Sequence, residues 1–221
     1  MKLVPFLPFA FIYSFFYYIF NVSKYRSIFF KKRSLFFYIK NYLNIFRNTI
    51  LSFPEIKGKI RISLSEDFLK IGGKESLIMV TLHFGIWEYL PSIFSKLGYK
   101  TAIFVSNYRN KLYKRIVDLI RADMGVSFYR NINNIKQGSL IGFTLDNIGR
   151  KTITTKGIRF SKIPFILSRR YDIPVIPIVG WRDDGYFVVE TGNFVDSVEK
   201  VVKWFMKRVL KKPEQYVWVG K

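Results

Sequence analysis

His83, the one histidine of this 221-residue chain, is its clearest candidate for acid–base chemistry, because the sequence has no cysteine and imidazole alone has an ordinary pKa near neutrality. Glu88 follows five positions later, and the apolar run Ser76–Leu82 comes directly before. If His83 lies in the turn after a strand and Glu88 in the first turn of the next helix, the carboxylate can accept a proton from one ring nitrogen and leave the other basic toward a hydroxyl. The spacing leaves the alternative equally open, a packed histidine and a helix charge that never meet.

The apolar pattern predicts elements that would position this pair. From Ser76 onward short β-rich runs alternate with amphipathic segments, which is typical of an α/β fold with a mostly parallel sheet flanked by helices. Ligands in such folds bind at the carboxyl ends of strands, where His83 falls. Asp183 and Asp184, beside Gly185, predict a hairpin turn. The predicted strands are Ser76–Leu82, Thr101–Ser106, Ser139–Leu145, Ile173–Val179 and Tyr186–Thr191, and the predicted helices are Trp87–Leu97, Lys111–Met124, Pro164–Tyr171 and Asp196–Lys212.

An uncharged, aromatic-rich stretch, Leu3–Phe20, lies near the start of the sequence. At about 1.5 Å per residue it is about long enough to cross a hydrocarbon core of roughly 30 Å as a helix. Basic residues follow between Lys24 and Arg33, which by the positive-inside rule places the rest of the chain in the cytoplasm. We therefore expect a membrane anchor helix over residues 1–22 and one domain over residues 23–221. A helix that lies on the membrane surface is the alternative.

The charge balance indicates polyanionic partners but does not distinguish among the classes of polyanion. Lys and Arg number 37 against 15 Asp and Glu, a net charge of +22, which attracts anionic lipid, phosphorylated substrates, acidic carrier proteins or nucleic acid. Residues 22–72 mix aromatic side chains with lysines, which suits amphipathic helices on a membrane and also single-stranded nucleic acid. The absence of cysteine excludes a thiol nucleophile, and we predict no metal site. The G-x-S-x-G, P-loop and dinucleotide motifs do not occur.

The block from His83 to Glu88, H-F-G-I-W-E, resembles the H-x4-D/E motif of the lysophospholipid acyltransferase superfamily. With its glycine, tryptophan and glutamate it is similar to the late lipid A (lauroyl/myristoyl) acyltransferases. Ile86 and Asn147 depart from the asparagine and glutamine common in that family, and residues 154–157 depart from its F-F-G. Further blocks follow in the family's order: Tyr108-Arg109, Arg121 with Gly125, Gly138 to Asp146-Asn147, Ile173–Pro177 and Pro213–Trp218.

The resemblance implies transfer of a fatty acyl group from acyl carrier protein or acyl-coenzyme A to a hydroxyl of a lipid A precursor or related glycolipid. It implies His83 as general base and Glu88 as its partner, with Arg109, Arg121 and Asp146 in substrate binding. The thioester is a co-substrate, so no cofactor is implied, and no nucleic-acid partner is expected. The location implied is the inner membrane, with the catalytic domain on the cytoplasmic side.

Other interpretations stay open on the sequence alone. The arginines also fit solvated helix charge, and Asp146 also fits a structural cap. A glycerophospholipid acyltransferase of the same superfamily is one alternative, although Glu88 and the Pro213–Trp218 block argue against it. The other is a non-catalytic basic protein that binds membrane or nucleic acid.

Overall fold

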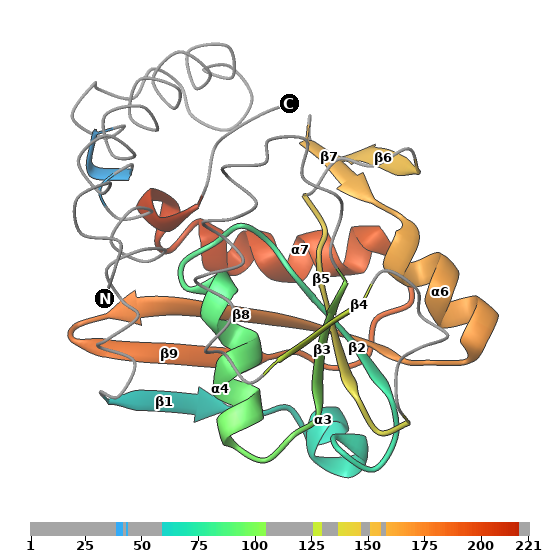
Figure 1. Ribbon diagram of the computed structural model, residues 1–221. Coiled ribbons are helices and arrows are strands. Elements are labelled where there is room, and N and C mark those ends of the chain that lie inside the picture. Colours follow the sequence, from blue (N-terminus) through green and yellow to red (C-terminus); the bar gives the residue numbers. More distant parts are fainter. Residues whose placement is uncertain are drawn as a thin grey trace, which may run out of the picture.

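A computed structural model describes residues 39–41, 43, 59–104, 126–129, 137–146, 151–155 and 158–216. Its centre is a seven-stranded sheet of order β1-β9-β8-β2-β5-β3-β4 (Figure 1). Every neighbouring pair in this sheet is parallel except β8–β9. The mostly parallel sheet of the predicted α/β fold is therefore confirmed. The strands are β1 (Ile60–Ser63), β2 (Leu77–Thr81), β3 (Thr101–Phe104), β4 (Ser127–Tyr129), β5 (Leu140–Thr144), β8 (Val175–Asp183) and β9 (Tyr186–Thr191).

Strand β2 is the buried centre of the sheet. Every one of its residues is buried, and Ile78 pairs with Val175 of β8 on one side and Ile141 of β5 on the other. A continuous apolar run of this kind is typical of a parallel strand covered on both faces. Leu77 and Met79 contribute to one hydrophobic cluster, whereas Ile78 and Val80 contribute to a second, because alternate side chains point to opposite faces.

Helices cover both faces of the sheet (Figure 1). On one face α3 (Glu66–Ile71) and α4 (Leu90–Lys96) bury Phe68, Ile93 and Phe94. On the other face lie α6 (Ile163–Tyr171), which buries Phe165, and α7 (Val198–Val209), which buries Phe205 and four valines. Short 3-10 turns, η5 (Trp87–Tyr89) and η7 (Pro213–Gln215), precede α4 and follow α7.

Most of the sequence-predicted elements are present, with ends that move by a few residues. Every predicted strand exists, and the helix predicted over Trp87–Leu97 divides into η5 and α4. The predicted hairpin turn is also confirmed, since β8 ends at Asp183 and β9 begins at Tyr186. The predicted helix Lys111–Met124 lies outside the described residues. Elements that we did not predict are β1, α3, β4 and a separate antiparallel pair, β6 (Thr152–Thr155) and β7 (Ile158–Ser161).

The predicted membrane segment, Leu3–Phe20, and the proposed boundary between residues 22 and 23 lie outside the described residues. Within the described part of the chain, no helix combines the length and the apolar character needed to cross a bilayer. The anchor and the two-part organisation therefore stay predictions.

Candidate active site

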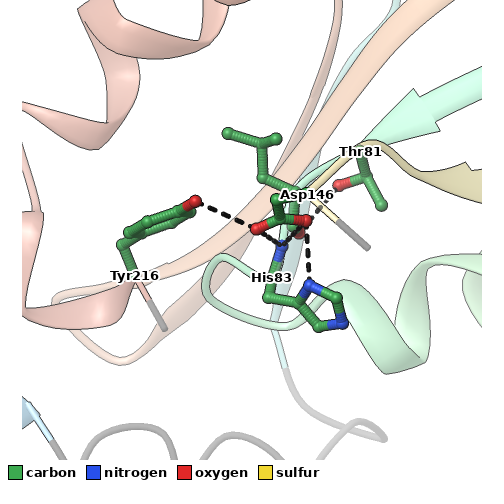
Figure 2. Close-up of polar contacts among 5 residues, drawn as sticks. Thr81, His83, Asp146 and Tyr216 are labelled. Atoms are coloured by element: carbon green, nitrogen blue, oxygen red, sulfur yellow. Dashed lines mark hydrogen bonds and ion pairs between the residues drawn. The ribbon is translucent and has the colours of Figure 1, made fainter. Parts of the chain in front are cut away.

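His83 and Asp146 meet at one edge of the sheet (Figure 2). The two residues occupy equivalent places, because Thr81 of β2 pairs with Thr144 of β5 and each site residue lies two positions beyond its strand. Adjacent parallel strands bring their carboxyl ends to the same edge. The Nδ1 atom of His83 lies 2.8 Å from Oδ1 of Asp146.

Three groups hold the Asp146 carboxylate: the Nδ1 atom of His83, the backbone N–H of His83 and the hydroxyl of Tyr216. The backbone N–H of His83 donates to both carboxylate oxygens at 3.1 Å, and the hydroxyl of Tyr216 donates to Oδ2 at 3.0 Å. The Asp146 side chain is 8% exposed, whereas the imidazole is 32% exposed. The site thus pairs a buried, fixed carboxylate with an imidazole that solvent can reach.

The electrostatics of the pair determine which ring nitrogen carries the proton. Burial acts to raise the pKa of Asp146, but the charge of His83 and hydrogen bonds from His83 and Tyr216 outweigh burial, so the net change is a lowered pKa. An ionised carboxylate can only accept, so Nδ1 of His83 carries the proton and Nε2 carries the lone pair. Burial, followed by the charge of Asp146 and its hydrogen bond, raises the pKa of Tyr216 well above its ordinary value, so that hydroxyl stays protonated as a donor.

The loop after His83 is fixed by a close backbone crossing. Gly85 has φ of 57°, in the left-handed region, and a Cβ there would lie 2.0 Å from the carbonyl oxygen of Gly180 in β8. That same oxygen accepts a hydrogen bond from the N–H of Ile86 at 2.9 Å. Glycine at position 85 is therefore required twice, for its backbone angle and for its lack of a side chain.

The segment 213–216 joins this loop to β8. The side-chain amide of Gln215 accepts from the Arg182 N–H at 3.0 Å and donates to the Arg182 carbonyl at 2.9 Å, as a neighbouring strand would. The backbone carbonyl of Gln215 accepts from the N–H of Gly85 at 2.8 Å, and Phe84 forms an antiparallel bridge with Tyr216. The segment that carries Tyr216 is thereby positioned against both the loop and the sheet.

Trp87 and Glu88 begin the turn η5 directly behind the loop. The Trp87 ring meets the His83 ring edge to face, with centroids 5.3 Å apart. Its indole N–H is buried and has no acceptor among the described residues. Glu88 is half-buried, and its charge adds to burial in raising the pKa of Tyr89.

The structure brings together two of the five sequence-predicted site residues, His83 and Asp146. The carboxylate on Nδ1 of His83 is that of Asp146, for which the resemblance implies substrate binding, and the pairing predicted for Glu88 stays a prediction. Arg109 and Arg121 lie outside the described residues. Tyr216 was missed as a site residue, and the only sign of it was its place in the Pro213–Trp218 block. Among the described residues, no group of three or more potential metal ligands gathers.

No family model matches the chain, and no curated protein matches it. Among solved structures, it is similar to the crystal structure of the 1-acyl-sn-glycerophosphate acyltransferase from Thermotoga maritima. The identity is 13%, the match covers 93% of this chain and 96% of that one, and the TM-score is 0.39. A likeness of this strength carries no functional argument.

Proposed function

We propose that this chain is an O-acyltransferase that moves a fatty acyl group from a thioester to a hydroxyl of a membrane lipid. The observation that carries the proposal is the His83–Asp146 pair, a reachable imidazole whose Nδ1 is held at 2.8 Å by a buried carboxylate. This arrangement fits a general base that removes a proton from a hydroxyl. The ordered motif blocks that include His83, Asp146 and the segment from Pro213 support acyl transfer as the reaction.

In the proposed reaction, Nε2 of His83 takes the proton of the acceptor hydroxyl while its oxygen attacks the thioester carbonyl carbon. The resulting tetrahedral intermediate carries its negative charge on the former carbonyl oxygen. The C–S bond then breaks, and the thiolate takes the proton from the imidazolium to leave as a free thiol. Asp146 stabilises the imidazolium and keeps the ring oriented throughout.

The oxyanion needs its own donor, because base catalysis of this kind contributes only about 10²–10⁴ in rate. Trp87 is our candidate among the described residues, since it contacts the His83 ring and has a buried indole N–H without an acceptor there. A buried donor without a partner costs about 1–3 kcal/mol, so this N–H would gain free energy from an oxygen acceptor brought to it. We further propose that Arg109 and Arg121 contact the phosphate or the thioester. Glu88 is our proposal for a second carboxylate that stabilises positive charge on the imidazole.

We further propose that the acyl acceptor is a lipid A precursor or related glycolipid and that the acyl donor is acyl carrier protein or acyl-coenzyme A. The net charge of +22 suits an anionic lipid surface, a phosphorylated acceptor and an acidic carrier protein, but does not by itself distinguish a glycolipid from another phosphorylated lipid. We place the reaction at the cytoplasmic side of the inner membrane, with residues 1–22 as the anchor. The resemblance from His83 to Trp218 is the basis for the glycolipid.

The test is transfer of labelled acyl groups by membranes that contain wild type, His83→Ala or Asp184→Asn. Each donor is offered with a lipid A precursor and, separately, with lysophosphatidic acid. We expect transfer to the lipid A precursor, a loss of about 10² or more in His83→Ala, and no loss in Asp184→Asn, whose residue lies in the β8–β9 turn.

The other outcomes separate the alternatives. Transfer to lysophosphatidic acid alone would indicate a glycerophospholipid acyltransferase. Undiminished transfer by His83→Ala would rule out the mechanism. No transfer from either donor by folded, membrane-bound wild type would favour the non-catalytic binding protein.

A further inference from the structure

Tyr216 links segment 213–216 to the His83–Asp146 pair, which lies far from it in the sequence. Tyr216 donates to Oδ2 of Asp146 at 3.0 Å, while Oδ1 faces Nδ1 of His83 at 2.8 Å (Figure 2). The two oxygens of one carboxylate are thus divided between the tyrosine and the ring. A carboxylate held on both oxygens cannot rotate away from the imidazole without losing a hydrogen bond.

Asn41 in turn holds the backbone that carries Tyr216. Its side-chain NH2 donates to the carbonyl of Glu214 at 2.7 Å and to the carbonyl of Tyr216 at 2.8 Å. Asn41 is fully buried and lies in the helical residues 39–41. The two carbonyls flank Gln215, whose side chain pairs with β8. Segment 213–216 is therefore held by Asn41 at the carbonyls of Glu214 and Tyr216 and by the Arg182 backbone at the side chain of Gln215.

From these contacts we infer that Tyr216 is a positioning residue for the imidazole, and that this positioning depends on the hydrogen bonds that Asn41, in the helical residues 39–41, donates to segment 213–216. The inference deepens the proposed acyl transfer and rests on it for its catalytic meaning. Because the predicted anchor precedes Asn41 in the chain, the placement of the base is joined to the part of the chain that we expect at the membrane.

The inference has a measurable electrostatic consequence. Removal of the Tyr216 hydroxyl leaves Asp146 with one donor fewer, while the His83 backbone N–H still holds the carboxylate near the ring. The carboxylate then becomes a stronger partner for the protonated imidazole. The titration midpoint of His83 in Tyr216→Phe should therefore move to higher pH.

The experiment uses the fact that His83 is the only histidine. NMR of the full chain in detergent micelles, with ¹³C-labelled histidine and an affinity tag without histidine, gives one imidazole signal that needs no assignment. We expect the midpoint to rise by about 0.5 pH unit or more in Tyr216→Phe, and by less in Asn41→Leu, which removes both donated hydrogen bonds. Tyr99→Phe is the matched control, because Tyr99 packs against Phe68 and Phe94 away from the site, and its midpoint should equal that of wild type.

Kinetics then test the catalytic meaning. Tyr216→Phe should lower kcat about tenfold with KM nearly unchanged, and the acid limb of its pH profile should move with the NMR midpoint. Midpoints in folded Tyr216→Phe and Asn41→Leu that equal the wild-type midpoint would overturn the inference. If Tyr216→Phe does not fold, Asn41→Leu alone decides. The titration needs no substrate, so its result stands even if the proposed transfer is not found.

Discussion

In the described part of the chain, the turn after β2 and the turn after β8 each depend on a left-handed glycine, but they are stabilised by different contacts. In the hairpin between β8 and β9, Gly185 has φ of 80°, and a Cβ added there would meet nothing within 4 Å. In the loop after β2, Gly85 has φ of 57°, and a Cβ would lie 2.0 Å from the carbonyl oxygen of Gly180. The first turn needs only the backbone freedom of glycine, whereas the second also needs its lack of a side chain.

The difference lies in what surrounds each turn. The hairpin follows from its own residues, because Asp184 and Gly185 both adopt positive φ and match the two-residue turn that antiparallel strands favour. The His83 loop is shaped by partners from distant segments: Gly180 from β8, Gln215 from η7 and Asp146 from the end of β5. A turn held in this way can keep an imidazole in one orientation, which a solvated hairpin cannot do.

Two exchanges of a carboxylate for an amide, one at Asp146, which holds the His83 loop, and one at Asp184 in the hairpin, should give the largest difference between the two turns. Both oxygens of Asp146 accept hydrogen bonds, so the amide in Asp146→Asn would have to direct its NH2 toward His83 or Tyr216. Toward His83 it would favour the tautomer with the proton on Nε2, which cannot act as base. We expect Asp146→Asn to lower acyl transfer by about 10²–10⁴, measured as initial rates with labelled thioester.

The matched change is Asp184→Asn in the hairpin. Asparagine tolerates the left-handed conformation that Asp184 adopts at φ of 42°, so rate and stability should stay near wild type. A comparable loss of rate in both variants would contradict the distinction between the turns. Full activity in Asp146→Asn would remove Asp146 from the mechanism.

Adding one methyl group to each glycine gives the next largest difference. Gly85→Ala adds a left-handed alanine and a clash with backbone that cannot shift easily, so we expect a loss of about 3 kcal/mol or more in unfolding free energy. Gly185→Ala meets only the backbone penalty, about 1 kcal/mol. Urea unfolding followed by fluorescence of the detergent-solubilised proteins measures both. Equal losses would mean that the crossing at Gly180 relaxes readily.

The same contrast explains which features of the fold and of the site could be predicted from the sequence. The hairpin, the parallel strands and the position of His83 after β2 follow from local pattern, since they depend on residues within one short segment. The Asp146 carboxylate beside Nδ1 does not, because adjacency of β2 and β5 depends on the order of strands in the sheet. The spacing and the resemblance predict Glu88, five positions away, as the partner of His83, whereas the carboxylate observed on Nδ1 lies 63 positions away from His83.

Tyr216 and Asn41 were harder still to predict. Tyr216 reaches Asp146 only because Gln215 and Asn41 fix the backbone on either side of it, and these contacts span up to 175 positions. No periodicity indicates such a contact. β1, α3 and β4 were missed for a different reason, since they are only 4, 6 and 3 residues long and a pattern over so few residues does not separate strand from helix.

The smallest expected effect is the dependence of stability on pH. The folded protein lowers the pKa of Asp146 below its unfolded value, which is about 3.9. Such a group stabilises the fold fully above the unfolded pKa, and this contribution is lost as the pH falls through the folded pKa.

Wild type should therefore lose unfolding free energy as the pH falls below about 4. Asp146→Asn should lose less unfolding free energy over the same pH range. Asp184→Asn is the control, because it changes a carboxylate in the turn between β8 and β9 and leaves the hydrogen bonds to Asp146 in place. Urea unfolding at a series of pH values decides this, and parallel curves for wild type and Asp146→Asn would show that the hydrogen bonds to Asp146 favour the ionised and protonated forms equally.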